Sequence, residues 1–239
     1  MGASGAAGCF DSAQHDNLPM NWEAIALTLK LATITCLVLL VVGLPIAYWL
    51  AFTKWRWRFL VESVVALPLV LPPTVLGFYL LLAMGPNGPL GAWFGLRLPF
   101  TFEGLLIASV IYSLPFTVQP AAAAFQAVDW RAIEAAQVAG AAPVRAFLQM
   151  VIPLAGGGVL TAVVLSFAHT MGEFGVVLMV GGNIQGVTRT ASIDVYDKVQ
   201  MLDYTAAGET ALFLLVTSYA LLTAVYGLNR GLFKVWPQR

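Results

Sequence analysis

Two ionisable side chains, His169 and Glu173, interrupt a long apolar stretch and are the residues there most able to do chemistry. Their spacing of four residues places both on one face of a helix, where a local His–Glu hydrogen bond could neutralise them. A charged carboxylate costs about 3 kcal/mol or more at the centre of a membrane, so Glu173 must face protein, water or the opposite interface. Two such ligands are too few for a metal site, and no nucleophile motif accompanies them. We therefore expect neither a metal centre nor catalytic residues.

A short segment between two apolar runs, residues 104–128 and 146–172, carries small and helix-forming residues, namely Glu134, Ala135, Ala136 and Gly140. Asp129 lies upstream, where the start of a helix favours an acid. Gly140 suits a left-handed helix end or the close approach of another backbone. The segment therefore predicts a small helix–turn–helix knob at the membrane surface, able to sit in a groove of another protein.

The spacing from Glu-Ala-Ala through Gly140 to Met150-Val151-Ile152-Pro153 resembles the cytoplasmic coupling loop of ABC importer permeases. Family members usually carry Ile and Leu-Pro in the last part, where this chain has Met150 and Ile152-Pro153. In that family the loop docks on a separate ATPase subunit. The resemblance thus implies a coupling loop at about residues 129–150, with ATPase-coupling roles for Glu134, Ala135, Ala136, Gly140 and Pro153. An ordinary Ala-rich surface loop is the alternative.

The composition defines the class of protein. The 239 residues are 59% hydrophobic and only 10% charged, against about 25% charged in soluble domains. This indicates an integral membrane protein, and the net charge of zero gives no reason to expect nucleic acid as a partner. Cys9 and Cys36, the only cysteines, predict no disulfide framework and no cysteine metal site. Residues 1–19 lack the basic and apolar regions of a signal peptide, so we expect a disordered tail there, and Met20 is an alternative start.

A membrane helix needs about 20 mostly apolar residues, and five stretches qualify. They are about residues 22–52, 63–84, 104–128, 147–180 with an interruption at Glu173, and 210–228. We expect an all-α transmembrane permease domain over residues 20–239 with about five transmembrane helices. The resemblance implies the type I fold of ABC importer permeases.

Basic residues are divided unevenly among the loops. Eight lie after the first span, in the Glu-Ala-Ala segment or in the C-terminal tail, namely Lys54, Arg56, Arg58, Arg131, Arg145, Arg230, Lys234 and Arg239. Three lie in the other loops, namely Arg97, Arg189 and Lys198. Because cytoplasmic loops carry the excess of Lys and Arg, we predict an external N-terminus, a cytoplasmic C-terminus and a cytoplasmic Glu-Ala-Ala segment.

Prolines break several of the predicted spans. The second span contains Pro68, Pro72 and Pro73, and the third contains Pro115 and Pro120. Each interior proline removes a backbone hydrogen bond, which lipid cannot replace. The prolines are therefore either packing kinks or parts of a cavity or gate. Residues 67–75 also resemble the second span of molybdate and sulfate permeases, and we assign Pro72 and Pro73 to the gate or pathway.

The segment Gly172-Glu173-Phe174-Gly175 resembles a segment of ABC permeases for oxyanions, namely molybdate, tungstate or sulfate. In that family it borders the translocation pathway near the dimer axis. Members often carry Arg where this chain has His169. Because a carboxylate is a poor ligand for an oxyanion, we assign Glu173 to structure or gating. The predicted gate residues are Pro72, Pro73, His169, Thr170, Gly172 and Glu173.

The Gly-rich stretch from residue 181 to Asp197 resembles the molybdate branch of these permeases. The leading hypothesis is the membrane subunit of a molybdate importer in a bacterial inner membrane, which works by alternating access and forms a homodimer. The chain contains no phosphate-binding loop motif, so ATP is expected only on a partner ATPase, and a periplasmic binding protein is the other expected partner. The alternatives are a sulfate or tungstate permease, an ATP-independent channel or secondary transporter, and a membrane enzyme.

The interior of the spans offers few groups that could hold a dianion. Lys30 is the only cation there, and hydroxyl groups come from Thr74, Thr161, Ser166 and Thr170. These groups can ease a passage but are poorly suited to tight binding. We therefore expect the permease alone to bind molybdate no more tightly than about millimolar, which corresponds to about 4 kcal/mol.

Overall fold

The computed structural model describes residues 20–95, 97–129 and 147–233, together with the single residues 131, 134, 138, 140, 142 and 145. Within these residues the chain forms helices and connecting turns, with no strand. The helices are α1 (Trp22–Phe52), α2 (Arg58–Val70), α3 (Pro73–Met84), α4 (Pro89–Phe94), α5 (Phe102–Gln126), the π-helical turn η2 (Phe147–Val151), α8 (Ile152–Leu154), α9 (Gly156–Met171), α10 (Gly175–Gly181), α11 (Ala191–Gln200) and α12 (Tyr204–Phe233).

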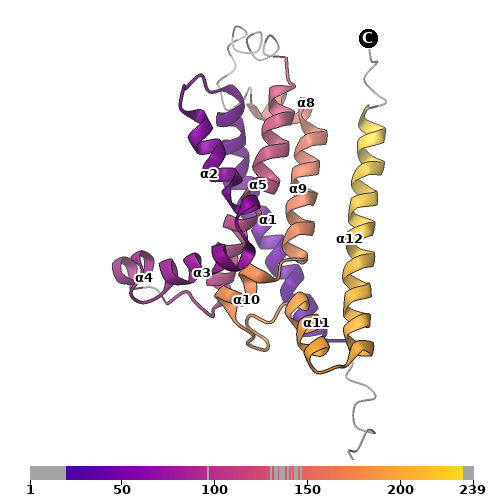
Figure 1. The fold of residues 1–239 in the computed structure, drawn as a ribbon. Helices are drawn as coiled ribbons and strands as arrows, with labels where there is room; N and C mark the ends of the chain where they lie inside the picture. The colour runs from indigo at the N-terminus through magenta and orange to yellow at the C-terminus, as the bar shows by residue number, and fades with distance from the viewer. Residues whose placement is uncertain are drawn as a thin grey trace, which may run out of the picture.

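Three long helices, α1, α5 and α9, form the centre of the molecule (Figure 1). In lipid, helices associate through close packing rather than through the hydrophobic effect, so small residues at the contacts matter. A Cβ atom at Gly43 of α1 would lie 3.0 Å from the Thr117 Cγ2 atom of α5. One at Gly158 of α9 would lie only 2.2 Å from the Cβ atom of Ala124. Glycine is therefore required at Gly158 for α5 and α9 to approach as they do.

The remaining helices surround this centre unequally. α2 packs on α5, while α3 and α4 extend away from the bundle and α3 packs on α10 (Figure 1). α12 is held by α11 and α9. Large apolar side chains on α3 and α12 are exposed in the single chain, among them Phe78, Leu82, Leu212 and Leu215. Such surfaces suit contact with lipid or with another membrane protein.

The expected number of spans agrees with the described residues, but the bounds of the second, fourth and fifth predicted spans differ from the structure. Four helical stretches are long and apolar enough to cross a membrane, and a bent pair would make a fifth. The predicted second span, residues 63–84, is divided after Val70, and Pro73–Ala92 is the stretch of sufficient length. With 13 residues, α2 is about 20 Å long and too short to cross alone.

The predicted fourth span, residues 147–180, is divided twice. Its first part, Phe147–Leu154, meets Gly156–Met171 at a bend of 76°. Its last part is the separate helix α10, which begins at Gly175. The fifth span is longer than expected, because α12 begins at Tyr204 rather than near residue 210.

The basic segments gather at one end of the bundle. The α1–α2 connection, the C-terminal end of α5 and the C-terminal end of α12 all lie at the top of Figure 1, while α10 and α11 lie at the other end. Trp49, Trp55 and Trp57 are partly exposed near the basic connection, as is typical of a membrane–water interface. The sequence-based grouping of these loops on one side is therefore consistent with the topology. The expected tail, residues 1–19, lies outside the described residues.

Candidate functional site

The structure brings together two helix breaks that are about a hundred residues apart in the sequence. One separates α2 from α3 at Leu71–Pro72, and the other separates α9 from α10 at Gly172–Phe174. We call them the paired breaks. A Cβ atom at Gly175 would lie 2.7 Å from the Cβ atom of Pro73, and one at Gly77 would lie 2.7 Å from that of Met179. The two predicted gate motifs are thus in direct contact.

Consecutive prolines explain the first break. A residue that precedes proline is driven out of the helical region, and both Leu71 (ψ 136°) and Pro72 (ψ 135°) are extended. Pro73 then occupies the first position of α3, where its missing N–H group costs nothing. By contrast, α5 continues through Pro115 and Pro120 without a break. The prolines at residues 72 and 73, not those in α5, therefore interrupt the path of the chain.

The Glu173 side chain is buried at the second break, with 3% of its surface exposed. Both of its carboxylate oxygens lack a hydrogen-bond partner of good geometry among the described residues, as does the nearby Ser109 hydroxyl group of α5. The Glu173 backbone carbonyl accepts a hydrogen bond of 2.6 Å from Ser192. Since a buried charge is costly unless it is paired, this carboxyl group is poised to respond to any movement that admits water or a partner.

The predicted His169–Glu173 pairing was wrong. α9 ends at Met171, so Glu173 does not continue the helical face of His169. The His169 Nδ1 atom instead lies 3.0 Å from the Ser113 hydroxyl oxygen of α5. The His169 ring stacks on Phe116 at 3.8 Å and lies beside Tyr112 at 4.8 Å. The His169 ring thus lies in an aromatic setting formed by two side chains of α5.

Thr170 and Gly172 complete the end of α9. The Thr170 hydroxyl group lies 2.9 Å from that of Ser113 and donates to the carbonyl group of Ser166. The backbone N–H group of Gly172 donates to the carbonyl groups of Ala168 and His169, which caps the helix. Ser113 therefore connects α5 to both His169 and Thr170 directly before the break.

A buried ion pair lies next to the paired breaks and was not predicted from the sequence. Lys198 and Asp194 of α11 are 2.8 Å apart and are 7% and 3% exposed. Asn21 donates to Asp194, and Lys198 donates to Thr210 of α12. The ion pair thereby joins the start of α1, α11 and α12. The sequence did not indicate this ion pair. Its two residues are polar, and the residues that contact them, Asn21 and Thr210, are distant in the sequence or lie on another helix.

We call residues 129–150 the coupling segment; among its described residues, 131, 134, 138, 140, 142 and 145 are exposed. The backbone N–H group of Arg131 donates to the Asp129 carboxylate at 2.9 Å, as expected for the start of a helix. Glu134 and Val138 are helical and exposed, Val138 to 89%. Gly140 has a φ angle of 89°, the left-handed conformation expected of it. Ala135 and Ala136 lie outside the described residues.

Aromatic packing anchors the end of the coupling segment to the bundle. The Phe147 ring lies 4.8 Å from Tyr48 of α1 and 5.8 Å from Phe125 of α5. Pro153 is exposed in the first turn of α8, beside the 76° bend that leads into α9. A displacement of the coupling segment would therefore be transmitted to α1, α5 and α9 together.

Solved structures with this architecture are membrane components of ABC importers. The chain is similar to a chain of a bacterial alginate ABC transporter, with a TM-score of 0.72, 16% identity and coverage of 89% of this chain and 79% of that one. It is also similar to a chain of the MetNI methionine ABC transporter in an inward-facing conformation, with a TM-score of 0.67, 16% identity and coverage of 90% and 98%. The described all-helical bundle with its broken spans is thus an ABC importer permease in fold.

Residues 43–234 match the family described as the binding-protein-dependent transport system inner membrane component, and the chain belongs to that family. It is therefore a transport component of the inner membrane and not an enzyme. The molybdenum transport system permease protein ModB of Azotobacter vinelandii is 53% identical over 211 residues, which cover 87% of this chain and 93% of that protein. ModB of Escherichia coli K12 is 36% identical over 223 residues, or 91% and 96%. The sulfate transport system permease protein CysT of Escherichia coli K12 is 31% identical over 188 residues, or 77% and 68%.

Proposed function

We propose that this chain is the membrane subunit of an ATP-driven molybdate importer and that two copies enclose the translocation pathway. The observation that carries the proposal is the 53% identity to a molybdenum transport permease over 87% of the chain. The resemblance of residues 181–197 to the molybdate branch agrees with it. ATP is hydrolysed on a separate ATPase, and a binding protein delivers the oxyanion to the external end.

The coupling segment is the proposed contact with the ATPase. It lies at the end where the basic loops gather (Figure 1), which is the cytoplasmic end if the excess of Lys and Arg marks the inside. Its exposed Val138 and the left-handed Gly140 present a small apolar surface that has no cover in the single chain. Phe147 and the bend at Pro153 carry movement of this segment into the bundle.

The paired breaks are the proposed gate, with Pro72, Pro73, His169, Thr170, Gly172 and Glu173 as its residues. They lie toward the end opposite the coupling segment (Figure 1), so they suit control of the external side. α3 and α10 contact each other through Pro73 and Gly175, and each helix is separated from its neighbour by a break. Rigid short helices between flexible breaks can move without unfolding the bundle, as alternating access requires.

Uptake by cells tests the proposal. A strain that lacks this gene, starved of molybdate, should recover molybdoenzyme activity and uptake of labelled molybdate when the gene is restored together with its ATPase and binding protein. A tenfold excess of tungstate should compete, because the two oxyanions are nearly the same size, whereas sulfate should not. Competition by sulfate alone would favour the sulfate permeases, to which the chain is also related. Uptake without any ATPase would favour a channel or secondary transporter.

A further inference from the structure

One face of α5 carries a stripe that neither the proposed gate nor the coupling segment accounts for. Its members are Ser109, Tyr112, Phe116, Gln119, Ala123 and Gln126. They recur at intervals of three or four residues within one helix, so they lie on one side of it. We call this stripe the α5 track. Other faces of α5 also make helix contacts, as Phe125 does in the cluster with α1 and Ala124 does against Gly158 of α9.

Exposure changes from one end of the α5 track to the other. Ser109 is fully buried beside Glu173 at the second of the paired breaks. Tyr112 and Phe116 are partly buried against the His169 ring. Gln119 and Gln126 are exposed. The track is therefore closed at the end that holds the proposed gate and open at the end that holds the coupling segment.

The depth of Gln119 makes its exposure informative. It lies seven residues before the end of α5, or about 10 Å along the helix. A helix of 25 residues is about 37 Å long, which exceeds the roughly 30 Å hydrocarbon core by only a few ångström at each end. Gln119 is thus inside the hydrocarbon region, where lipid cannot satisfy the two donors and the acceptor of its amide. Water or protein must cover it.

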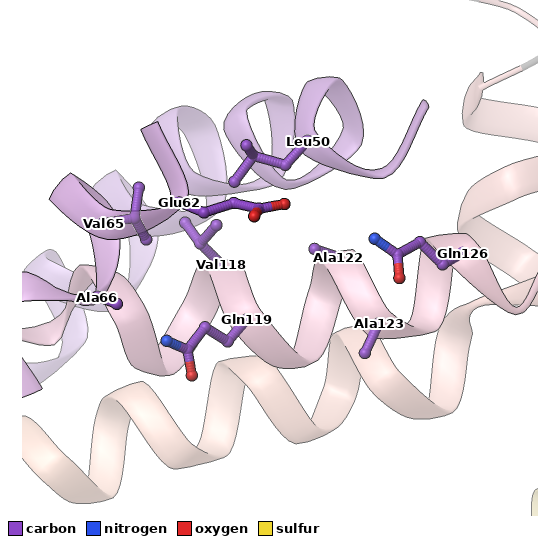
Figure 2. A pocket seen from close by; sticks show the side chains of 9 residues that line it. All are labelled: Leu50, Glu62, Val65, Ala66, Val118, Gln119, Ala122, Ala123 and Gln126. Atoms are coloured by element: carbon purple, nitrogen blue, oxygen red, sulfur yellow. The ribbon is translucent and has the colours of Figure 1, made fainter. Parts of the chain in front are cut away.

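An open cavity adjoins this part of the track. Its volume is about 320 Å³, and its walls come from α1, α2 and α5. Figure 2 shows Glu62 reaching from α2 over α5, with Gln126 farther along α5 and Gln119 at the other edge of that helix; all three line the cavity. Arg58 lies 3.6 Å from Glu62, and both side chains are roughly half exposed. Polar groups from two helices therefore line one hollow, which suits water better than lipid.

We propose that the α5 track is a wall of the aqueous passage and that Gln119 is its main hydrogen-bond donor to the oxyanion in the inner half. The identity of the ion rests on the proposed function, whereas the presence of water along the track does not. The amide of Gln119 supplies two N–H donors and no charge, so it eases passage without holding a dianion firmly. The Glu62 carboxylate at the open end repels an anion and favours its departure into the cytoplasm.

Accessibility of introduced cysteines tests the track directly. The permease, in complex with its ATPase in membranes, carries Cys9→Ser and Cys36→Ala together with one new cysteine, at Gln119, Gln126 or Val64. Val64 is the matched control, because it lies on α2 at a similar distance from the same end and is 68% exposed. A charged, membrane-impermeant thiosulfonate reagent requires the thiolate, which forms in water and not in lipid.

We expect Gln119→Cys and Gln126→Cys to react at least about tenfold faster than Val64→Cys. Trapping of the ATPase with vanadate should slow the reaction at position 119, because the inner side then closes. Reaction at position 119 no faster than at position 64 would overturn the proposal.

Uptake distinguishes the two proposals. Gln119→Leu should lower molybdate uptake at least about tenfold, while Gln119→Asn, which keeps the donors, should retain most of it. Fast labelling at position 119 in a complex that does not import molybdate would refute the proposed substrate and leave the track standing. Molybdate import that is unchanged in Gln119→Leu would refute the role of Gln119 and leave the proposed function standing.

Discussion

The paired breaks lie inside the molecule, whereas the coupling segment lies on its surface. At the breaks, Glu173 is 3% exposed and Gly175 touches Pro73 so closely that no Cβ atom would fit. In the coupling segment, Val138 is 89% exposed and a Cβ atom at Gly140 would meet nothing within 4 Å. Both regions carry glycine and an acid, but Glu173 is buried whereas Glu134 is exposed.

This difference predicts which properties a substitution should change in each region. The breaks are supported by packing and hydrogen bonds to α3, α5 and α11, so changes there should affect folding and transport together. At the ends of the coupling segment, the Asp129 cap and the Phe147 ring tie the described residues to the bundle. Changes between those ends should affect association with a partner and leave the stability of the chain unchanged.

The largest loss of stability is expected at the ion pair that supports the breaks. Asp194→Ala leaves the Lys198 ammonium group buried without its carboxylate, which should lower the free energy of unfolding by about 3 kcal/mol. Thermal unfolding of the detergent-solubilised protein measures it. The double variant Asp194→Leu/Lys198→Met removes both charges and should recover most of the loss. A single variant as stable as the parent would show that the pair does not hold α11 in place.

A smaller loss is expected at the contact between the two breaks. Gly175→Ala places a methyl group 2.7 Å from the Cβ atom of Pro73, and such overpacking costs about 1–3 kcal/mol. Gly208→Ala is the matched control, because Gly208 lies in α12, outside the gate, and a Cβ atom there would meet nothing within 4 Å. Unfolding and uptake should both suffer in the first variant only. If the two variants have equal stability and equal uptake, the contact between α3 and α10 plays no part in the gate.

The smallest energetic effect is expected between His169 and Glu173. Glu173→Gln removes a buried carboxyl group without changing its shape, so the complex should assemble while transport changes. In a double-mutant cycle on stability, Glu173→Gln and His169→Ala should couple by less than about 0.5 kcal/mol, because the two side chains have different neighbours. Coupling with Ser109→Ala should be larger. A larger coupling energy of Glu173→Gln with His169→Ala than with Ser109→Ala would show that His169 and Glu173 interact, contrary to the structure.

The sequence was informative wherever apolar composition or proline controls the backbone. The charge-free runs predicted α1, α5 and α12, and consecutive prolines indicated the site at which the second span breaks. Gly140 was expected to be left-handed and is. These predictions succeed because hydrophobic length, missing N–H groups and positive φ angles are local properties of the chain.

The parts that could not be predicted depend on contacts between distant residues. α11 was missed because its buried positions include Asp194 and Lys198, so the helix lacks an apolar face of its own. The partner of His169 was misassigned because α9 ends before Glu173, and the alternative partner, Ser113, comes from α5. Gln119 was not among the predicted pathway groups, which were the Lys30 cation and hydroxyl groups, although a neutral amide at that depth is also costly in lipid.

The central claim is that this permease is driven by a separate ATPase through its coupling segment, and Gly140→Leu tests it most directly. A branched side chain is strained at a φ angle of 89° and would enlarge the surface that docks. Gly208→Leu is the control, because Gly208 of α12 is exposed and likewise has open space around it. Both variants should fold like the parent, and only Gly140→Leu should lose co-purification of the ATPase and uptake of molybdate, each by about tenfold or more, equivalent to at least about 1.4 kcal/mol. Undiminished ATPase association and uptake in Gly140→Leu would contradict the account.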